Sequence, residues 1–205
     1  MSSAWQLTFE SYLNDDEVLA LRKTLEAAVI IAKSKGHQGP VRDQCIILVA
    51  LKTGLRVSEL CNLKLADLDL KPRGVSQLIV RSGKRGKKRM IPFGVNLKNT
   101  ISDYLEYRVK DSEYVFPSDK RDHMSSSAVQ KAFKKWAKKA QLPSRFSIHS
   151  LRHTAATRSY IASGYNLRLV QVILGHAQIT TTSIYSAVIN PDLEKVALAL
   201  DELEE

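Results

Sequence analysis

Two short β-type segments stand in the middle of a chain whose other periodic segments have helical spacing. The segments SQLIVR (76–81) and KRMIPF (88–93) flank a glycine-containing loop, which predicts an antiparallel hairpin. With 44% hydrophobic residues over 205 positions, the chain can build a real core around that hairpin. We therefore predict an α+β fold: one mainly helical domain with a small antiparallel sheet at one edge.

Helical periodicity predicts the elements on both sides of the hairpin. Asn14 and Glu17 form a capping box for a helix that runs to Gly36, and Pro40 is predicted to open a central apolar helix that ends at Gly54. The remaining helices are expected over 95–109, over 125–140, in three segments after Pro143 that break at Gly164 and Gly175, and from Pro191 onward.

Composition narrows the function classes. No apolar run approaches the ~20 residues of a membrane span, and the chain does not begin like a signal peptide, so a cytoplasmic protein is expected. Cys45 and Cys61 fall inside predicted helices and indicate reduced core residues. The net charge is +10, and because residues 190–205 hold one Lys and six acids, residues 1–189 carry +15. This charge favours a nucleic-acid partner, with a solvated basic surface as the alternative.

Two basic clusters are candidates for contact with nucleic acid. The hairpin tip, RSGKRGKKR (81–89), has six basic side chains around two glycines and could enter a DNA groove. The predicted helix 125–140 has an apolar stripe on one face and five lysines elsewhere. Both clusters could also be simply solvated. The candidate DNA contacts are Arg81, Arg85, Lys87, Lys88, Lys134 and Lys138.

Arginine and histidine pairs form a more specific pattern. Arg56 follows a helix-ending glycine, and Glu59 three residues later can hold its guanidinium, although such pairs are usually surface ion pairs of small value. His149 and Arg152 lie three apart at a helix start and could bind a phosphate together. His153 invites a metal interpretation, but no carboxylate or third ligand stands at a suitable spacing.

Tyr185 follows His176 by nine residues, with three consecutive threonines between them. An isolated tyrosine of this kind is more often a buried aromatic whose hydroxyl is satisfied. The order of the motifs changes that assessment, because the chain presents Arg, a basic hairpin, His-x-x-Arg, Gly-His and Tyr in succession.

In this order, the segments TGLRVSEL, GKRGKKRMIP, HSLRHTAAT and LVQVILGHAQITTTSIYS resemble the catalytic domain of the tyrosine recombinases, the phage integrase family, over about residues 10–190. The resemblance implies site-specific cleavage and rejoining of double-stranded DNA through a covalent 3′-phosphotyrosyl intermediate, without metal, nucleotide or other cofactor. The catalytic positions that it implies are Arg56, Lys84, His149, Arg152, His176 and Tyr185, with Glu59 in support.

The chemistry agrees with this resemblance. Attack of the Tyr185 phenol on a phosphodiester adds negative charge to the non-bridging oxygens, and arginine forks bind such oxygens in pairs without losing their charge. Two histidines add donors, and His149 is placed to help accept the tyrosine proton. Lys84 would protonate the departing 5′ oxygen, with the neighbouring hairpin lysines and arginine as alternatives.

The resemblance also implies a domain organisation. Residues 1–10 are a leader that is too short for the N-terminal clamping domain of most members, and residues 11–189 form the catalytic domain. Residues 190–205 are an amphipathic tail, whose helix over 191–203 would dock on a neighbouring subunit in a DNA-bound tetramer or pack on its own domain. Accessory DNA-bending proteins are further candidate partners.

Two other function classes stay open. A non-catalytic DNA-binding regulator could keep the same scaffold, and DNA binding without a covalent adduct would favour it. A type IB topoisomerase-like strand transferase shares the chemistry, and relaxation of supercoiled plasmid by a monomer would favour that class.

Overall fold

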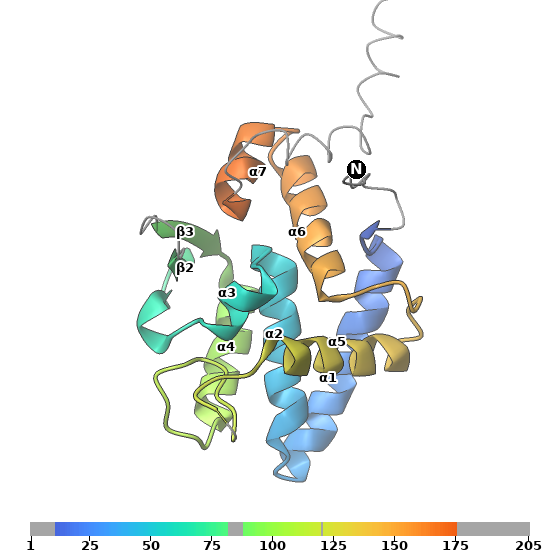
Figure 1. Ribbon diagram of the computed structural model, residues 1–205, viewed down its shortest axis with the longest axis vertical. Coiled ribbons are helices and arrows are strands. Elements are labelled where there is room, and N and C mark those ends of the chain that lie inside the picture. The colour runs from blue at the N-terminus through green and yellow to red at the C-terminus, as the bar shows by residue number, and fades with distance from the viewer. Residues whose placement is uncertain (1–10, 82–87, 120, 176–205) are drawn as a thin grey trace, which may run out of the picture.

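Helices dominate the chain and a three-stranded antiparallel sheet lies at one edge, as the sequence predicts (Figure 1). The computed structural model describes residues 11–81, 88–119 and 121–175. In chain order the elements are α1 (Asp15–Ser34), α2 (Gln38–Thr53), α3 (Val57–Cys61), the 3-10 helix η2 (Leu65–Asp67), β1 (Leu68–Asp69), β2 (Ser76–Arg81), β3 (Lys88–Phe93), α4 (Val95–Tyr107), α5 (Ser126–Lys139), α6 (Ile148–Ala162) and α7 (Leu167–Leu174).

The capping box predicted for the first helix is confirmed. The Glu17 backbone N–H donates to Asn14 Oδ1, and the Asn14 N–H donates to Glu17 Oε2, both at 2.8 Å. These bonds give partners to two donors that the first turn leaves unpaired. The start of α1 is therefore determined by local sequence.

Helix α2 lies at the centre of the molecule. It contacts α1, α4, α5 and α6, and its Cys45, Ile46 and Ile47 side chains are completely buried (Figure 1). It begins at Gln38, two residues before the predicted start, because Pro40 sits in the first turn, where an N–H has no helical partner to lose. It ends as predicted at Gly54, whose φ of 64° is the left-handed conformation that glycine adopts readily.

The two strands of the predicted hairpin are confirmed residue for residue. Strands β2 and β3 pair antiparallel, with Ser76 opposite Phe93, while β1 pairs with β2 along its other edge and was not predicted. Ile91 and Phe93 of β3 are buried, and because side chains alternate along a strand, Arg89 points to the same face. A charged side chain thus enters the interior of the molecule from the sheet.

Helix α5 buries its predicted stripe, including Phe133 and Trp136, and keeps its five lysines exposed. Trp136 Nε1 donates to Asp43 Oδ2 of α2 at 2.9 Å, which satisfies the indole N–H inside the core. Helix α4 ends at Tyr107, slightly before the predicted 109. The periodic segments that lie within the described residues are therefore present as helices with small shifts at their ends.

Helix α7 packs on α6 through a small cluster separate from the main core. Ala156 and Tyr160 of α6 and Val170 and Leu174 of α7 form it. α7 also contacts β3, so its C-terminal end lies beside the sheet (Figure 1). Few buried apolar residues hold this helix, and polar contacts at its end consequently matter more.

Cys45 and Cys61 are buried free thiols, as predicted. Over the part of the chain that the structure describes, none of the helices combines the length and apolarity needed to span a bilayer. The predicted segments 1–10 and 190–205 lie outside the described residues, so the division of the chain into leader, catalytic domain and tail stays a prediction.

Candidate active site

Arg56 stands at the corner between α2 and α3. Its backbone N–H donates to Glu59 Oε2 at 2.8 Å, and its guanidinium Nη1 donates to Glu59 Oε1 at 3.0 Å. The Arg56 side chain is 43% exposed, while that of Glu59 is 12% exposed. The carboxylate therefore holds an arginine whose guanidinium projects from a fixed corner, which is the arrangement that the three-residue spacing predicts.

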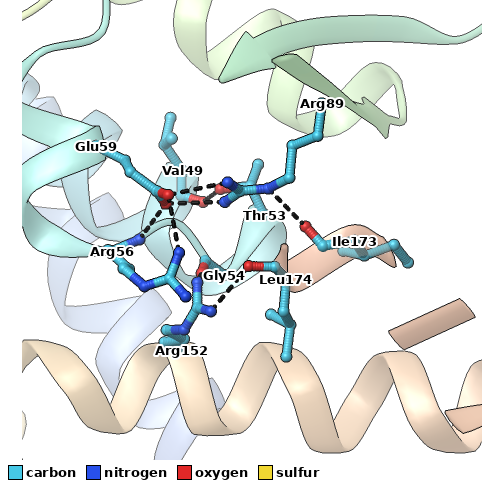
Figure 2. Close-up of polar contacts among 9 residues, drawn as sticks. All are labelled: Val49, Thr53, Gly54, Arg56, Glu59, Arg89, Arg152, Ile173 and Leu174. Carbon is cyan, nitrogen blue, oxygen red and sulfur yellow. Dashed lines mark hydrogen bonds and ion pairs between the residues drawn. The ribbon is translucent and has the colours of Figure 1, made fainter. Parts of the chain in front are cut away.

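Glu59 is held from a second side by Arg89, which the sequence analysis did not single out. Arg89 Nη1 donates to Glu59 Oε1 at 2.9 Å and Arg89 Nη2 to Oε2 at 2.8 Å, a bidentate pair between largely buried groups (Figure 2). Burial by itself raises the pKa of Glu59, but hydrogen bonds from Arg89 and Arg56, together with their charges, lower it below its ordinary value. The carboxylate is therefore ionised near neutral pH.

Arg152 is buried on α6, with 8% of the residue exposed. Its Nη1 donates to the carbonyl of Gly54, and its Nη2 donates to the carbonyl of Leu174 at 2.9 Å (Figure 2). Gly54 precedes Arg56 by two residues, so the fold brings the two predicted arginines to the same corner. These bonds orient the Arg152 guanidinium there.

Gly54 makes this corner possible. A Cβ at Gly54 would lie 2.7 Å from Leu174 Cδ2 and 3.3 Å from Ala155 Cβ, on a backbone with a φ of 64°. Only a residue without a side chain lets the end of α2 approach α6 and α7 this closely. The glycine thus serves both the turn and the packing of the site.

His149 lies in the first turn of α6. Ser147 caps this helix and its hydroxyl accepts the His149 N–H at 3.2 Å. His149 is exposed one turn before the buried Arg152. The helix start therefore places an imidazole at the surface, and its joint contact with Arg152 to a phosphate stays a prediction.

His153, the next turn of the same helix, is kept neutral by its surroundings. Burial, together with the positive charges of Arg152 and His149, lowers the pKa of His153 from 6.5 to about 4. In residues 11–81, 88–119 and 121–175, no three His, Cys, Asp or Glu side chains gather as a metal-binding group.

Because the folded chain resists protonation of His153, it should lose stability on mild acidification. Between pH 6.5 and pH 4.5 the unfolded chain binds a proton that the folded chain does not, so the free energy of unfolding falls as the pH falls, by up to about 2 kcal/mol from this group. His153→Gln should flatten the slope in that window, as measured by urea unfolding at several pH values. Parallel slopes for the two proteins would contradict this.

Several predicted site residues lie outside the described residues: Lys84, Arg85, Lys87, His176 and Tyr185. Gly175, with which the described part of the chain ends, directly precedes His176. The nucleophile, the second histidine and the hairpin acid therefore stay predictions.

The other candidate DNA contacts lie on two separate elements. Arg81 and Lys88 are exposed at the ends of β2 and β3, and Arg81 Nε forms an ion pair with the buried Asp67. Lys134 and Lys138 are exposed on α5, and Lys134 also donates to a backbone carbonyl of the following loop. Their contact with DNA stays a prediction.

The fold is a mainly helical domain with a three-stranded sheet, and two arginines meet at its Gly54 corner. Known proteins with a similar sequence show which family has this combination. Residues 12–190 match the phage integrase family. The chain is 36% identical over 200 residues to tyrosine recombinase XerA of Pyrococcus furiosus, covering 96% of this chain and 64% of that protein. It is 36% identical over 192 residues to tyrosine recombinase XerC of Staphylococcus carnosus, covering 91% and 60%. The chain belongs to the phage integrase family.

Solved structures agree with this fold. A crystal structure of XerA recombinase matches with a TM-score of 0.73 and 34% identity, over 92% of this chain and 64% of that one. XerH site-specific recombinase bound to its difH substrate matches with a TM-score of 0.75 over 95% of this chain and 56% of that one, and its 23% identity shows the fold alone. The chain spans about two thirds or less of the length of these relatives.

Proposed function

We propose that this chain is a site-specific recombinase that cleaves and rejoins strands of double-stranded DNA through a covalent bond to Tyr185. The observation that carries the proposal is the meeting of Arg56 and Arg152 at the Gly54 corner, in a chain of the phage integrase family. The relatives at 36% identity are named tyrosine recombinases, which supports the same class of reaction here.

The proposed reaction balances without a cofactor. The Tyr185 oxygen attacks the phosphorus, its proton passes toward His149, and a 3′-phosphotyrosyl bond forms as the bond to the 5′ oxygen breaks. The 5′ oxygen takes a proton from Lys84. Arg56 and Arg152, with His176, donate to the non-bridging oxygens, whose charge increases in the transition state. A second 5′-hydroxyl then reverses the attack, so the reaction needs no metal ion and no ATP.

Strand exchange between two duplexes needs more than one active site, so the proposal includes a homo-oligomer, a tetramer, on DNA. The segment proposed to join neighbouring subunits is 191–203, through an apolar stripe formed by Leu193, Val196, Ala197 and Leu200. Accessory DNA-bending proteins remain proposed partners. The basic charge of the chain predicts DNA binding that weakens steeply with salt.

The test is covalent capture from a library of duplexes with a random central sequence and a nick in one strand. Cleavage near the nick releases a short fragment that diffuses away, which traps the protein on the DNA. The protein and the duplexes react in a buffer with EDTA and without nucleotide. The protein-linked duplexes are then recovered after denaturation, and the linked peptide is mapped by mass spectrometry. We expect adducts on Tyr185. Duplexes that bind but form no adduct would favour a non-catalytic regulator, and adducts that need a divalent ion would contradict metal independence.

A further inference from the structure

We propose that Arg89 is a positioning residue for DNA cleavage, because one guanidinium fixes both Arg56, through Glu59, and the end of α7, from which the chain continues to His176 and Tyr185. The catalytic part of this inference rests on the proposed function. The structural part concerns described residues alone and can be measured without DNA.

The first contact of Arg89 is with Glu59. The two parallel bonds, at 2.9 and 2.8 Å, join side chains that are 13% and 12% exposed. Paired bonds between a guanidinium and a carboxylate fix the rotation of both groups, whereas a single bond leaves either free to turn. Glu59 also accepts both bonds from Arg56, so the orientation of Arg56 depends on a carboxylate that Arg89 locks (Figure 2).

The second contact is with α7. Arg89 Nε donates to the Ile173 carbonyl at 3.1 Å, and Arg152 donates to the next carbonyl, that of Leu174. The last carbonyls of a helix have no partner within the helix and carry partial negative charge, so cationic donors are favourable there. Two arginines, one from the sheet and one from α6, therefore cap the C-terminal end of α7 (Figure 2).

The third observation is the fit of Arg89 against Gly175. A Cβ on Gly175 would lie 2.8 Å from Arg89 Nη1 and 2.9 Å from its Cδ and Cζ. The Arg89 side chain therefore lies against the backbone of the residue that directly precedes His176. Any larger residue at Gly175 would have to displace it.

These contacts couple two halves of the site that come from distant parts of the chain. Helix α7 has eight residues and packs on α6 through a small apolar cluster, so its capped end depends strongly on the two arginines. Lysine keeps the positive charge of Arg89, but its single ammonium cannot bond two carboxylate oxygens and a carbonyl in one plane. Arg89→Lys is therefore the variant that removes the geometry and retains the charge.

The catalytic readout is the single-turnover rate of adduct formation on a duplex captured by the wild-type chain, compared with its dissociation constant. We expect Arg89→Lys to slow adduct formation about 10- to 100-fold, since small misplacements of reacting groups cost that much, while the dissociation constant changes less than about 3-fold. Glu59→Gln should slow it similarly. The double variant should be no slower than the slower single one, because Arg89 acts on Arg56 through Glu59.

The matched control is Arg108→Lys. Like Arg89, Arg108 donates from both terminal nitrogens. Its acceptors are the backbone carbonyls of Tyr114 and Ser112, at a different place in the fold. It should keep the wild-type rate. Losses from Arg89→Lys and Glu59→Gln that multiply in the double variant would overturn the pathway through Glu59.

The structural readout is hydrogen exchange of the free protein. In Arg89→Lys, the amides of Leu174 and Gly175 should exchange at least about 10-fold faster, with α5 unchanged, because the end of α7 opens locally. Unchanged exchange at the end of α7 would overturn the role of Arg89 there. If wild-type protein forms no adduct with any duplex, the proposed function fails, and hydrogen exchange still decides whether Arg89 holds α7. Should Arg89→Lys not fold, Glu59→Gln gives the same two readouts.

Discussion

Tyr185→Phe is expected to abolish the covalent adduct with DNA, to below ~10⁻⁴ of the wild-type rate, while DNA affinity changes less than about 2-fold. The substitution removes one oxygen, and that oxygen is the proposed nucleophile, so no other part of the site can replace it. Affinity should persist because phosphate contacts by basic side chains supply most of it. Denaturing gels of a nicked duplex measure the adduct, and fluorescence anisotropy measures binding.

Tyr107→Phe is the matched control, since it removes the hydroxyl of a tyrosine that donates to the Ala32 carbonyl at 3.5 Å, between α4 and α1. It should form adduct at the wild-type rate. An adduct that persists in Tyr185→Phe and maps to another residue would show that the motif order misidentified the nucleophile.

The elements that the sequence predicts well are those set by neighbouring residues. The capping box of Asn14 and Glu17, the glycine breaks at Gly54, Gly164 and Gly175, and both strands of the hairpin depend on signals a few residues apart. Strand β1 was not predicted because two residues are too few to show an alternating pattern. An element boundary shifts where a local signal fits more than one position. Pro40 fits both the first residue of a helix and its first turn, and in α2 it lies in the first turn after Gln38.

The contacts in the site also differ in how far apart their partners lie along the chain. The link between Arg56 and Glu59 spans three residues and is visible in the sequence, but Arg89 reaches Glu59 across 30 residues and Ile173 across 84. Such contacts exist only once the chain has folded. One clue to Arg89 was available, because it lies two and four residues before the apolar Ile91 and Phe93 on a predicted strand. A charge on a buried strand face usually has a partner.

The second large effect is expected for Arg152, whose sequence position predicted a phosphate contact but not a structural role. Arg152→Ala should slow cleavage about 10³-fold, the usual loss when a donor to developing charge is removed. It should also lower the free energy of unfolding by about 2–4 kcal/mol, because the buried carbonyls of Gly54 and Leu174 lose their partner and a cavity remains.

Arg56→Ala is the comparison that separates these two roles. Arg56 is 43% exposed and pairs with a carboxylate that Arg89 also holds, so its removal should cost only about 0–1 kcal/mol of stability. Its loss of cleavage rate should match that of Arg152→Ala, since both guanidiniums are proposed to bind the same phosphate. Single-turnover cleavage and urea unfolding measure the two quantities. Equal stability losses would show that the bonds of Arg152 to the two carbonyls do not hold α2, α6 and α7 together, whereas unequal rate losses would place the phosphate closer to one arginine.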